Sequence, residues 1–288
     1  MDTIRNPIEW GRDQLKHAAF ALGTTARAIG GTREAKDTAP PVVRRIELAD
    51  LKDVLRKGLS DFGAYRTDVI FLCLIYPVVG LVLARAAFGE DMLPLLFPLA
   101  SGFALVGPVA AVGLYEMSRR REQGDDITWA DAFGVVGAPS FGAIVLLGLI
   151  LGAIFVAWMV VAHVIYNMTL GPQPPASIEG FVSDVLTTAG GWTMIVVGVG
   201  VGFLFAVAVL AISVVSFPLL LDRGVSLGTA ISTSVRAVMK NPVPMAAWGV
   251  IVAGGLVLGS IPLFVGLIVV MPVLGHATWH LYRKVVTR

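Results

Sequence analysis

Two histidines near the carboxyl end are the residues whose type and spacing could carry chemistry. His276 and His280 are four residues apart in "LGHATWHLYRK", so a helix would place both imidazoles on one face. This spacing can hold a metal ion or a haem iron. No third ligand is recognisable, because the neighbouring sequence contains no acidic residue. We expect the pair to anchor the end of an apolar helix where it meets water, and a metal or haem site is the alternative.

Other combinations give little sign of catalysis. A haem–copper enzyme needs several histidines at mid-membrane depth, but His17 lies in the polar amino-terminal region and the other three lie near the ends of apolar segments. His163, with Tyr166 and Asn167, is expected to bond headgroups or loop carbonyls, with a ligand role as the alternative. No phosphate loop, nucleophile–base pair or carboxylate dyad is visible. We therefore expect no cofactor and no enzyme, although distant residues could still assemble a site.

Composition indicates the solvent that these residues face. Of the 288 residues, 56% are hydrophobic and 15% are charged, and the mean hydropathy is +0.79. Soluble domains carry about 25% charged residues, so most of this chain must face lipid. The net charge of +2 is too small to suggest nucleic acid. The single cysteine, Cys73, lies in an apolar run and has no thiol partner for a disulfide or a metal.

Six stretches are long and apolar enough to cross a bilayer as helices, which takes about 20 residues. The last two are separated only by Gly259, Ser260 and Pro262, which predict a tight hairpin. The fold class is therefore an all-α, polytopic membrane protein with six helices arranged as three hairpins. The expected spans are 69–88, 93–115, 142–166, 193–220, 243–260 and 263–282.

Lysine and arginine gather on one side of these spans. The connections 118–141 and 222–242 and the tail are basic, whereas 89–92 and 167–192 carry acidic charges only. The positive-inside rule therefore predicts that both termini are cytoplasmic. The first thirty residues mix charge signs and lack an apolar core, so we expect no cleavable signal peptide and an uncleaved first span.

The polar amino-terminal region predicts helices on the membrane surface. Residues 1–45 are expected to form a cytoplasmic amphipathic helix and a linker, followed by the transmembrane domain at 46–288. A second amphipathic segment, "RIELADLKDVLRKGLSDF", is expected to rest on an anionic leaflet or to dock on a partner protein. Its apolar face is predicted to comprise Leu48, Leu51, Leu55 and Phe62.

Two segments of the sequence, 98–120 and 262–284, share one plan. Each has two prolines ten residues apart with a glycine between them, followed at matching offsets by an aromatic residue and two bases. Similar amphipathic pieces precede the odd-numbered spans, so the predicted unit is a cytoplasmic helix followed by a hairpin, used three times. Prolines inside a helix bend it. Kinks are expected at Pro98, Pro108, Pro218, Pro262 and Pro272.

The entry into the first span, "LRKGLSDF…VIFLCLIYPVVGL", and the entry into the fifth, "SVRAVMKNPVPMAAWGVI", carry a family resemblance. With the hairpin unit, they resemble the domain-of-unknown-function family 2189 of bacterial integral membrane proteins. The resemblance covers about residues 45–286. It implies a six-helix fold in the bacterial inner membrane, and it brings no activity and no catalytic residues.

Within the spans, small residues are the main signal, because no Asp, Glu or Lys lies near the middle of any span. Glycines four residues apart let helix backbones approach closely, either inside the bundle or against a partner helix or a second copy. These pairs are Gly148/Gly152, Gly198/Gly202 and Gly255/Gly259.

Charges at the ends of spans are expected to pair with their neighbours. Residues 178–186 in the outer loop have apolar side chains on one helical face, which predicts a short helix on the membrane surface. The expected charge pairs are Arg85 with Glu90 or Asp91, Glu116 with Arg120, and Asp222 with Arg223.

Three functional classes fit this pattern. A non-enzymatic scaffold, assembly or accessory protein agrees best with the lack of buried charge and the glycine-rich faces; its partners would be the bilayer and another membrane protein or a second copy. A transporter of a weakly polar or lipid-like solute is the alternative, since repeats and broken helices suit alternating access. A membrane enzyme is the third. Transport would require a midplane cavity, which we expect to be lined by Ser101, Tyr76, Ser213 and Ser216.

Overall fold

The computed structural model shows an all-helical chain over the residues that it describes. These are 41–64, 93–125, 128–173, 175 and 177–287. They contain no β-strand, and one isolated antiparallel bridge joins Val43 to Val286. The expected first span, with Cys73 and Tyr76, and the expected amino-terminal helix lie outside these ranges.

Twelve elements make up the described part of the chain. They are α-helices and two 3-10 helices. In order they are α2 (Leu48–Ala64), η1 (Leu93–Leu95), α5 (Leu96–Ala110), α6 (Val112–Gln123), η2 (Trp129–Gly137), α7 (Phe141–Thr169), α8 (Ile178–Thr187), α9 (Ala189–Ser213), α10 (Ser216–Arg223), α11 (Leu227–Lys240), α12 (Pro242–Ser260) and α13 (Leu267–Val285).

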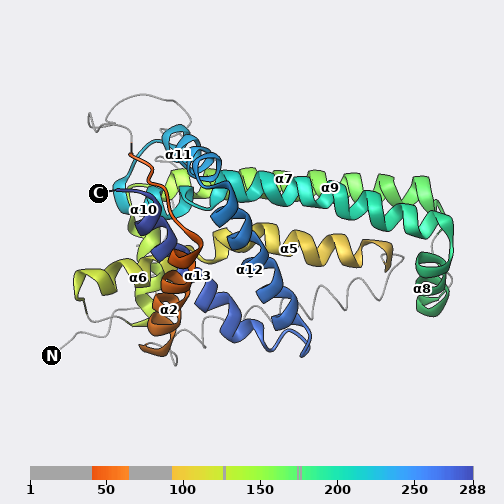
Figure 1. Cartoon of the computed structure of the whole chain (residues 1–288), viewed down its shortest axis with the longest axis horizontal. Coiled ribbons are helices and arrows are strands. Elements are labelled where there is room, and N and C mark those ends of the chain that lie inside the picture. The colour runs from red at the N-terminus through yellow and green to blue at the C-terminus, as the bar shows by residue number, and fades with distance from the viewer. Residues whose placement is uncertain (1–40, 65–92, 126–127, 174, 176, 288) are drawn as a thin grey trace, which may run out of the picture.

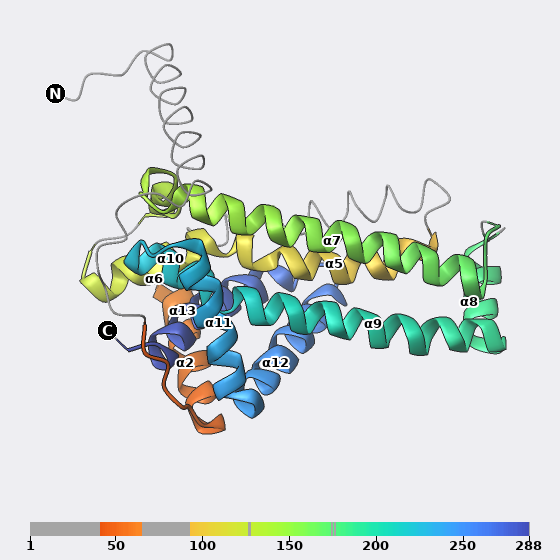
Figure 2. The ribbon, with the colours of Figure 1, turned by 90° about the horizontal axis from the view of Figure 1, so that it is seen from above.

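The elements divide into two regions. We call one the foot; it consists of α2, α6, η2, α10, α11 and the carboxyl half of α13. The other region consists of α5, α7 and α9, which extend side by side from the foot, and of α8, which lies at their far end (Figure 1). The view from above shows the same long arrangement of α7 and α9, with α12 leaving the foot at an angle (Figure 2).

Three helical stretches are long and apolar enough to cross a membrane. They are α7, the stretch Ala189–Arg223 that contains α9 and α10, and α12. These stretches confirm helices at the expected third, fourth and fifth spans. The expected second span is divided between α5 and α6, and the expected sixth span falls on α13, whose carboxyl half packs inside the foot. None of α5, α6 and α13 is among the three membrane-length stretches.

Helix α7 shows why these stretches suit a membrane. Leu147, Leu151 and Trp158 lie on one stripe and are at most 2% exposed. On the opposite face Leu149 and Val156 are 63% and 59% exposed. A helix that is apolar on all sides but buried on one stripe needs an apolar solvent for the rest. Helix α9 needs an apolar solvent more than α7 does. Only 6% of the most apolar 18-residue segment of the α9 stretch is buried, against 22% for α7.

The two copies of the repeated segment differ in helix continuity. The helix is interrupted at Ala111, shortly after Pro108, but α13 continues through Pro272. A second interruption separates α9 from α10, where the ring of Pro218 would clash with the carbonyl of Val214 in a continuous helix. Of the remaining prolines, Pro98 lies in the first turn of α5 and Pro262 lies in the turn between α12 and α13.

Most of the paired glycines lie against a neighbouring helix. A methyl group added at Gly202 would come within 3.0 Å of Trp158, and one added at Gly255 within 3.2 Å of Val270. At Gly259 it would lie 2.7 Å from Leu267, so the backbones of the α12–α13 hairpin are close. Gly148 faces Val109, whereas Gly152 and Gly198 have no described neighbour within 4 Å.

Candidate functional site

Helix α2 brings a carboxylate into the centre of the foot. Its first turn is capped by Asp50, which accepts the backbone N–H of Glu47 at 2.9 Å. Its buried face comprises Leu51, Val54, Gly58 and Asp61, and this face packs on α13. Leu48, expected on the apolar face, is 53% exposed. The buried stripe is therefore rotated from the expected one, and protein rather than a leaflet covers it.

The close approach of α2 to α13 depends on a glycine. A methyl group added at Gly58 would lie 2.7 Å from the Cβ of Ala277 and 2.7 Å from the carbonyl oxygen of Val273. Two small residues thus let the helices meet at backbone distance. One turn further along α2, this contact places the side chain of Asp61 between α13 and α6.

Asp61 accepts hydrogen bonds from three side chains. Its Oδ2 accepts from the Ser118 hydroxyl at 2.7 Å and faces Nε2 of His280 at 2.9 Å. Its Oδ1 accepts from the Arg121 guanidinium at 2.6 Å. Asp61 is 5% exposed. A buried carboxylate is stable only when paired and hydrogen-bonded, and these groups from α6 and α13 satisfy that requirement.

The surroundings of Asp61 lower its pKa. Burial by itself would raise the pKa, because it penalises the charged form, but the hydrogen bonds from His280 and Ser118 outweigh burial. The group therefore stays ionised at neutral pH. Its charge fixes α2 to both neighbouring helices.

His276 completes the buried cluster. Its Nδ1 lies 2.8 Å from the Ser118 hydroxyl oxygen. The single hydroxyl proton of Ser118 goes to Asp61, so Nδ1 of His276 must be the donor in this contact. The proton on Nδ1 leaves Nε2 with a lone pair, and this atom has no hydrogen-bond partner among the described residues.

This arrangement does not suit nucleophilic catalysis. A serine 2.8 Å from an imidazole resembles a nucleophile and its base. Here, however, the histidine nitrogen that faces Ser118 is protonated, and the serine proton is given to a carboxylate. Ser118 is 1% exposed and His276 is not exposed, so a substrate has no access.

Both histidines are covered by protein: His280 is 9% exposed and His276 is buried completely. The neighbouring sequence has no acidic residue, but the fold supplies one, because Asp61 comes from a helix 219 residues away in the chain. The metal hypothesis gains no support from the geometry: the described residues contain no group of three or more His, Cys, Asp or Glu side chains placed to hold a metal ion.

A second cluster confirms the expected pairing of Glu116. Its carboxylate lies 2.7 Å from Arg120, one turn ahead, and also 2.7 Å from Arg119. Arg120 continues to Asp131 on η2 at 2.5 Å. Gly134 leaves room for this guanidinium, since a methyl group there would lie 2.4 Å from Arg120. The cluster joins α6 to the turn that precedes α7.

A third cluster joins α10 to α13. Asp222 lies 3.7 Å from Arg223, which confirms that expected pair. It also accepts the hydroxyl of Tyr282 at 2.6 Å and faces Arg283 at 3.5 Å. Arg283 in turn lies 3.0 Å from Glu122 on α6. The side chains of the foot are therefore tied together across four helices.

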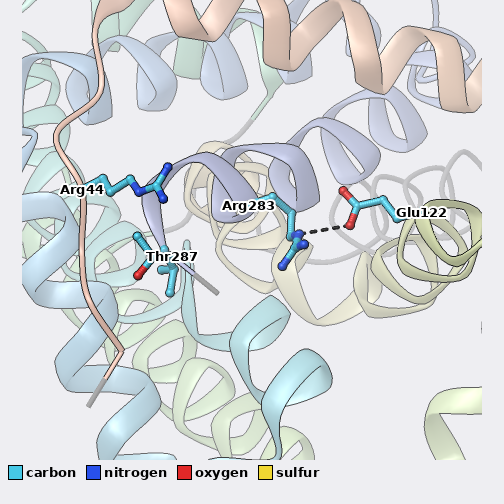
Figure 3. Close-up of a pocket in the computed structure, with 5 residues that line it drawn as sticks. Arg44, Glu122, Arg283 and Thr287 are labelled. Carbon is cyan, nitrogen blue, oxygen red and sulfur yellow. Dashed lines mark ion pairs between the residues drawn. The ribbon is translucent and has the colours of Figure 1, made fainter. Parts of the chain in front are cut away.

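An open cavity adjoins the third cluster. It has a volume of about 460 Å³ and is lined by the side chains in Figure 3 and by Val286. We call it the basin; its residues are Arg44, Glu122, Arg283, Val286 and Thr287.

The segment before α2 forms one wall of the basin. Arg44 donates its backbone N–H to the carbonyl of Val285 at 2.7 Å, and Thr287 donates to Val42 at 3.1 Å. The side-chain amide of Asn241 holds the same segment, because it donates to the carbonyl of Arg44 at 2.9 Å. The amino-terminal segment and the tail are thus joined by backbone hydrogen bonds.

The serines expected to line a transport cavity are buried or hydrogen-bonded within the protein. Ser101 donates to the carbonyl of Pro98 at 3.1 Å and also contacts the indole nitrogen of Trp158. Ser216 donates to the carbonyl of Ile212 at 2.5 Å. Ser213 and Ser216 are 3% and 0% exposed, and neither of them lines the basin described above.

The far end of the molecule agrees with the sequence. Helix α8 confirms a short helix in the 167–192 connection, and none of its residues is buried. Tyr166 donates its hydroxyl to the carbonyl of Gln173 at 2.7 Å and packs its ring on Phe181. The expected bond to a loop carbonyl is therefore made by Tyr166, while His163 is exposed.

Asp61, Ser118 and Arg121 were not identified from the sequence as a group. One signal was available for Asp61: it follows Leu51, Val54 and Gly58 at spacings of three, four and three, so it lies on the apolar stripe of its own helix. An acidic residue on such a stripe indicates a buried partner. Its partners could not be found in the same way, because they come from other helices.

Comparison with known proteins supports the membrane assignment. The model of the domain-of-unknown-function family 2189, described as a predicted integral membrane protein, matches residues 96–222. This range runs from the start of α5 almost to the end of α10 and is less than half of the chain. Neither the curated proteins nor the solved structures give a match. With the three membrane-length helices, the family match identifies an integral membrane protein.

Proposed function

We propose that the protein is a non-enzymatic scaffold, assembly or accessory protein of the bacterial inner membrane. In this proposal six helices cross the bilayer as three hairpins, each preceded by a cytoplasmic amphipathic helix. The foot and both termini lie in the cytoplasm, and α8 lies at the periplasmic surface.

The distribution of charge supports this orientation. The foot contains the arginines of α6, α10 and α13, whereas the connection that contains α8 has Glu179 and Asp184 and no basic residue. Basic residues remain on the cytoplasmic side of bacterial membrane proteins. The foot also has two amphipathic helices, α2 and α11, as the proposed unit requires.

The proposed role rests on the exposed surface of α9. Val196, Phe203 and Leu204 are 65% to 68% exposed along this helix. Gly200 has no described neighbour within 4 Å, so a helix of another subunit could approach the backbone there. The helices of the foot are linked by ion pairs, which suits a platform more than a catalytic site. We therefore place the partner-binding surface on α9.

Transport of a weakly polar or lipid-like solute is the second candidate. Two helix interruptions favour it, one at Ala111 and one between α9 and α10, because broken helices occur at transport sites. Ser101 and Ser216 were expected to line a transport cavity, but both donate hydrogen bonds to backbone carbonyls of the protein, and this favours the scaffold role. Uptake of a fluorescent lipid by proteoliposomes, compared with empty vesicles, distinguishes the two roles.

The main test is purification from the native membrane in mild detergent. We expect a defined protein, or a second copy of this chain, to copurify with the wild type and to be lost from Leu204→Trp. Val156→Trp is the matched control, since Val156 is 59% exposed on α7 while Leu204 is 65% exposed on α9. Equal copurification with both variants, or a monomer without a partner, would contradict the proposal.

A further inference from the structure

The basin places two guanidinium groups on opposite sides of one cavity. Figure 3 shows Arg44 on one side and Arg283 on the other, with Thr287 near Arg44 and Glu122 beyond Arg283. They come from separate parts of the chain, the segment before α2 and the last turn of α13. With a volume of about 460 Å³, the cavity is large enough for a small polar group.

The two arginines differ in how far their charge is neutralised. Arg283 lies 3.0 Å from Glu122 and 3.5 Å from Asp222, so two carboxylates share its charge. The side chain of Arg44 has no hydrogen bond or ion pair with any described residue. Among the described residues, the positive charge of Arg44 therefore has no acidic partner in the basin.

Arg44 is held in place by its backbone. Its N–H is bonded to Val285, and its carbonyl is bonded to Asn241, which is 3% exposed. Lys240 holds the preceding residue through the carbonyl of Val43 at 2.8 Å. The backbone at Arg44 is thus fixed by contacts that do not involve its side chain, so an incoming anion has only the arginine side chain to order.

We propose that the basin binds a phosphate group between Arg44 and Arg283. A guanidinium donates two parallel hydrogen bonds to a phosphate, and a tetrahedral phosphate has enough oxygens to face both arginines at once. The Thr287 hydroxyl lies in the same wall and donates its proton to the carbonyl of Val42 at 3.3 Å, so the two guanidinium groups are the donors for the phosphate. Glu122 stays paired with Arg283 and confines the phosphate to the side of Arg44.

The phosphate can come from two sources. One is the headgroup of an anionic phospholipid, which rests on the proposed cytoplasmic orientation of the foot. The other is a soluble phosphate compound, which requires no membrane orientation. A carboxylate ligand is less suited, because Arg283 already has carboxylate partners within the protein.

The test compares Arg44→Gln with Arg45→Gln in the full-length chain. Both arginines are exposed and adjacent, but only Arg44 lines the basin. Because the segment is held by its backbone, both variants should fold like the wild type. Arg44→Lys keeps the charge without the planar guanidinium, so it separates a phosphate site from simple attraction between charges.

Two measurements distinguish the sources. Native mass spectrometry measures retention of phosphatidylglycerol against phosphatidylcholine, and thermal unfolding in detergent measures stabilisation by inorganic phosphate against chloride at equal ionic strength. We expect Arg44→Gln to weaken one of these by roughly tenfold, Arg44→Lys to weaken it less, and Arg45→Gln to leave it within about twofold.

Each outcome decides the proposal. If Arg44→Gln loses only the retention of phosphatidylglycerol, the site binds a lipid. If Arg44→Gln loses only the stabilisation by inorganic phosphate, the site binds a soluble ligand. Equal behaviour of Arg44→Gln and Arg45→Gln in both measurements, or no binding by the wild type, overturns it. The copurification test on α9 is independent, so either proposal can fail without the other.

Discussion

The carboxylate of Asp61 on α2 lies 2.9 Å from Nε2 of His280 on α13, although 219 residues separate them in the chain. Both side chains are buried, and Ser118 and Arg121 on α6 share the same carboxylate. One acidic group thus holds three helices of the foot together. Because α2 and α13 pack closely around Asp61, we expect that water cannot take the place of its carboxylate in a variant that lacks it.

Asp61→Ala is expected to destabilise the foot by about 3 kcal/mol, because it leaves Arg121 and His280 without their carboxylate partner in a buried site. The measurement is thermal unfolding of the purified protein in detergent. Asp53→Ala is the control: Asp53 pairs with Arg56 at 2.8 Å and with Lys284 of α13 at 3.1 Å, but these pairs lie at the surface, so we expect a loss below about 1 kcal/mol. Equal losses for the two variants would show that the Asp61 cluster is not a central support.

Gly58→Ala is expected to lower stability by about 1–3 kcal/mol, because its methyl group would press on Ala277 and on the carbonyl of Val273 at 2.7 Å. Gly63→Ala, in the same helix, would meet no described residue within 4 Å and should raise stability by up to about 1 kcal/mol through helix propensity. The two midpoints of thermal unfolding should therefore move in opposite directions. A gain for both variants would mean that α2 does not pack on α13 as observed.

Acid should weaken the foot through its aspartates. The pKa of Asp61 is lowered from its ordinary value of 3.8, and the hydrogen bonds from Lys284 and Arg56 lower the pKa of Asp53 to about 2. A carboxylate whose pKa is lower in the folded state contributes stability above its unfolded pKa and loses it as the pH falls through the folded pKa. Unfolding temperature, measured from pH 7 downward, should drop below about pH 4, and less steeply in Asp61→Asn. An equal slope in this variant would assign the effect to other groups.

Local patterns predicted much of the secondary structure. The apolar runs gave α7, α9 and α12, since lipid-facing helices must be apolar along their whole length. Pairs within one helix turn, such as Glu116 with Arg120, were predictable because the helix itself sets their distance.

The centre of the foot was not predictable in the same way. The contact of Asp61 with His280 depends on how α2 packs on α13, and no periodicity within one helix encodes that packing. The interruption at Ala111 is a similar case, since the matching Pro272 lies in a continuous helix. The basin combines both difficulties, because Arg44 and Thr287 meet only when the two ends of the described chain pair.

The proposed orientation predicts which ends of the helices face the outside of the cell. In a chain whose Cys73 is replaced by alanine, Ser183→Cys on α8 and Ser232→Cys on α11 place single thiols on exposed positions at opposite ends of the molecule. A maleimide that cannot cross the inner membrane should label Ser183→Cys in spheroplasts and label Ser232→Cys only after the membrane is opened. Basic residues resist translocation, so the arginine-rich foot should remain inside. Labelling of Ser232→Cys in sealed spheroplasts, with protection of Ser183→Cys, would invert the proposed topology and place the basin outside the cytoplasm.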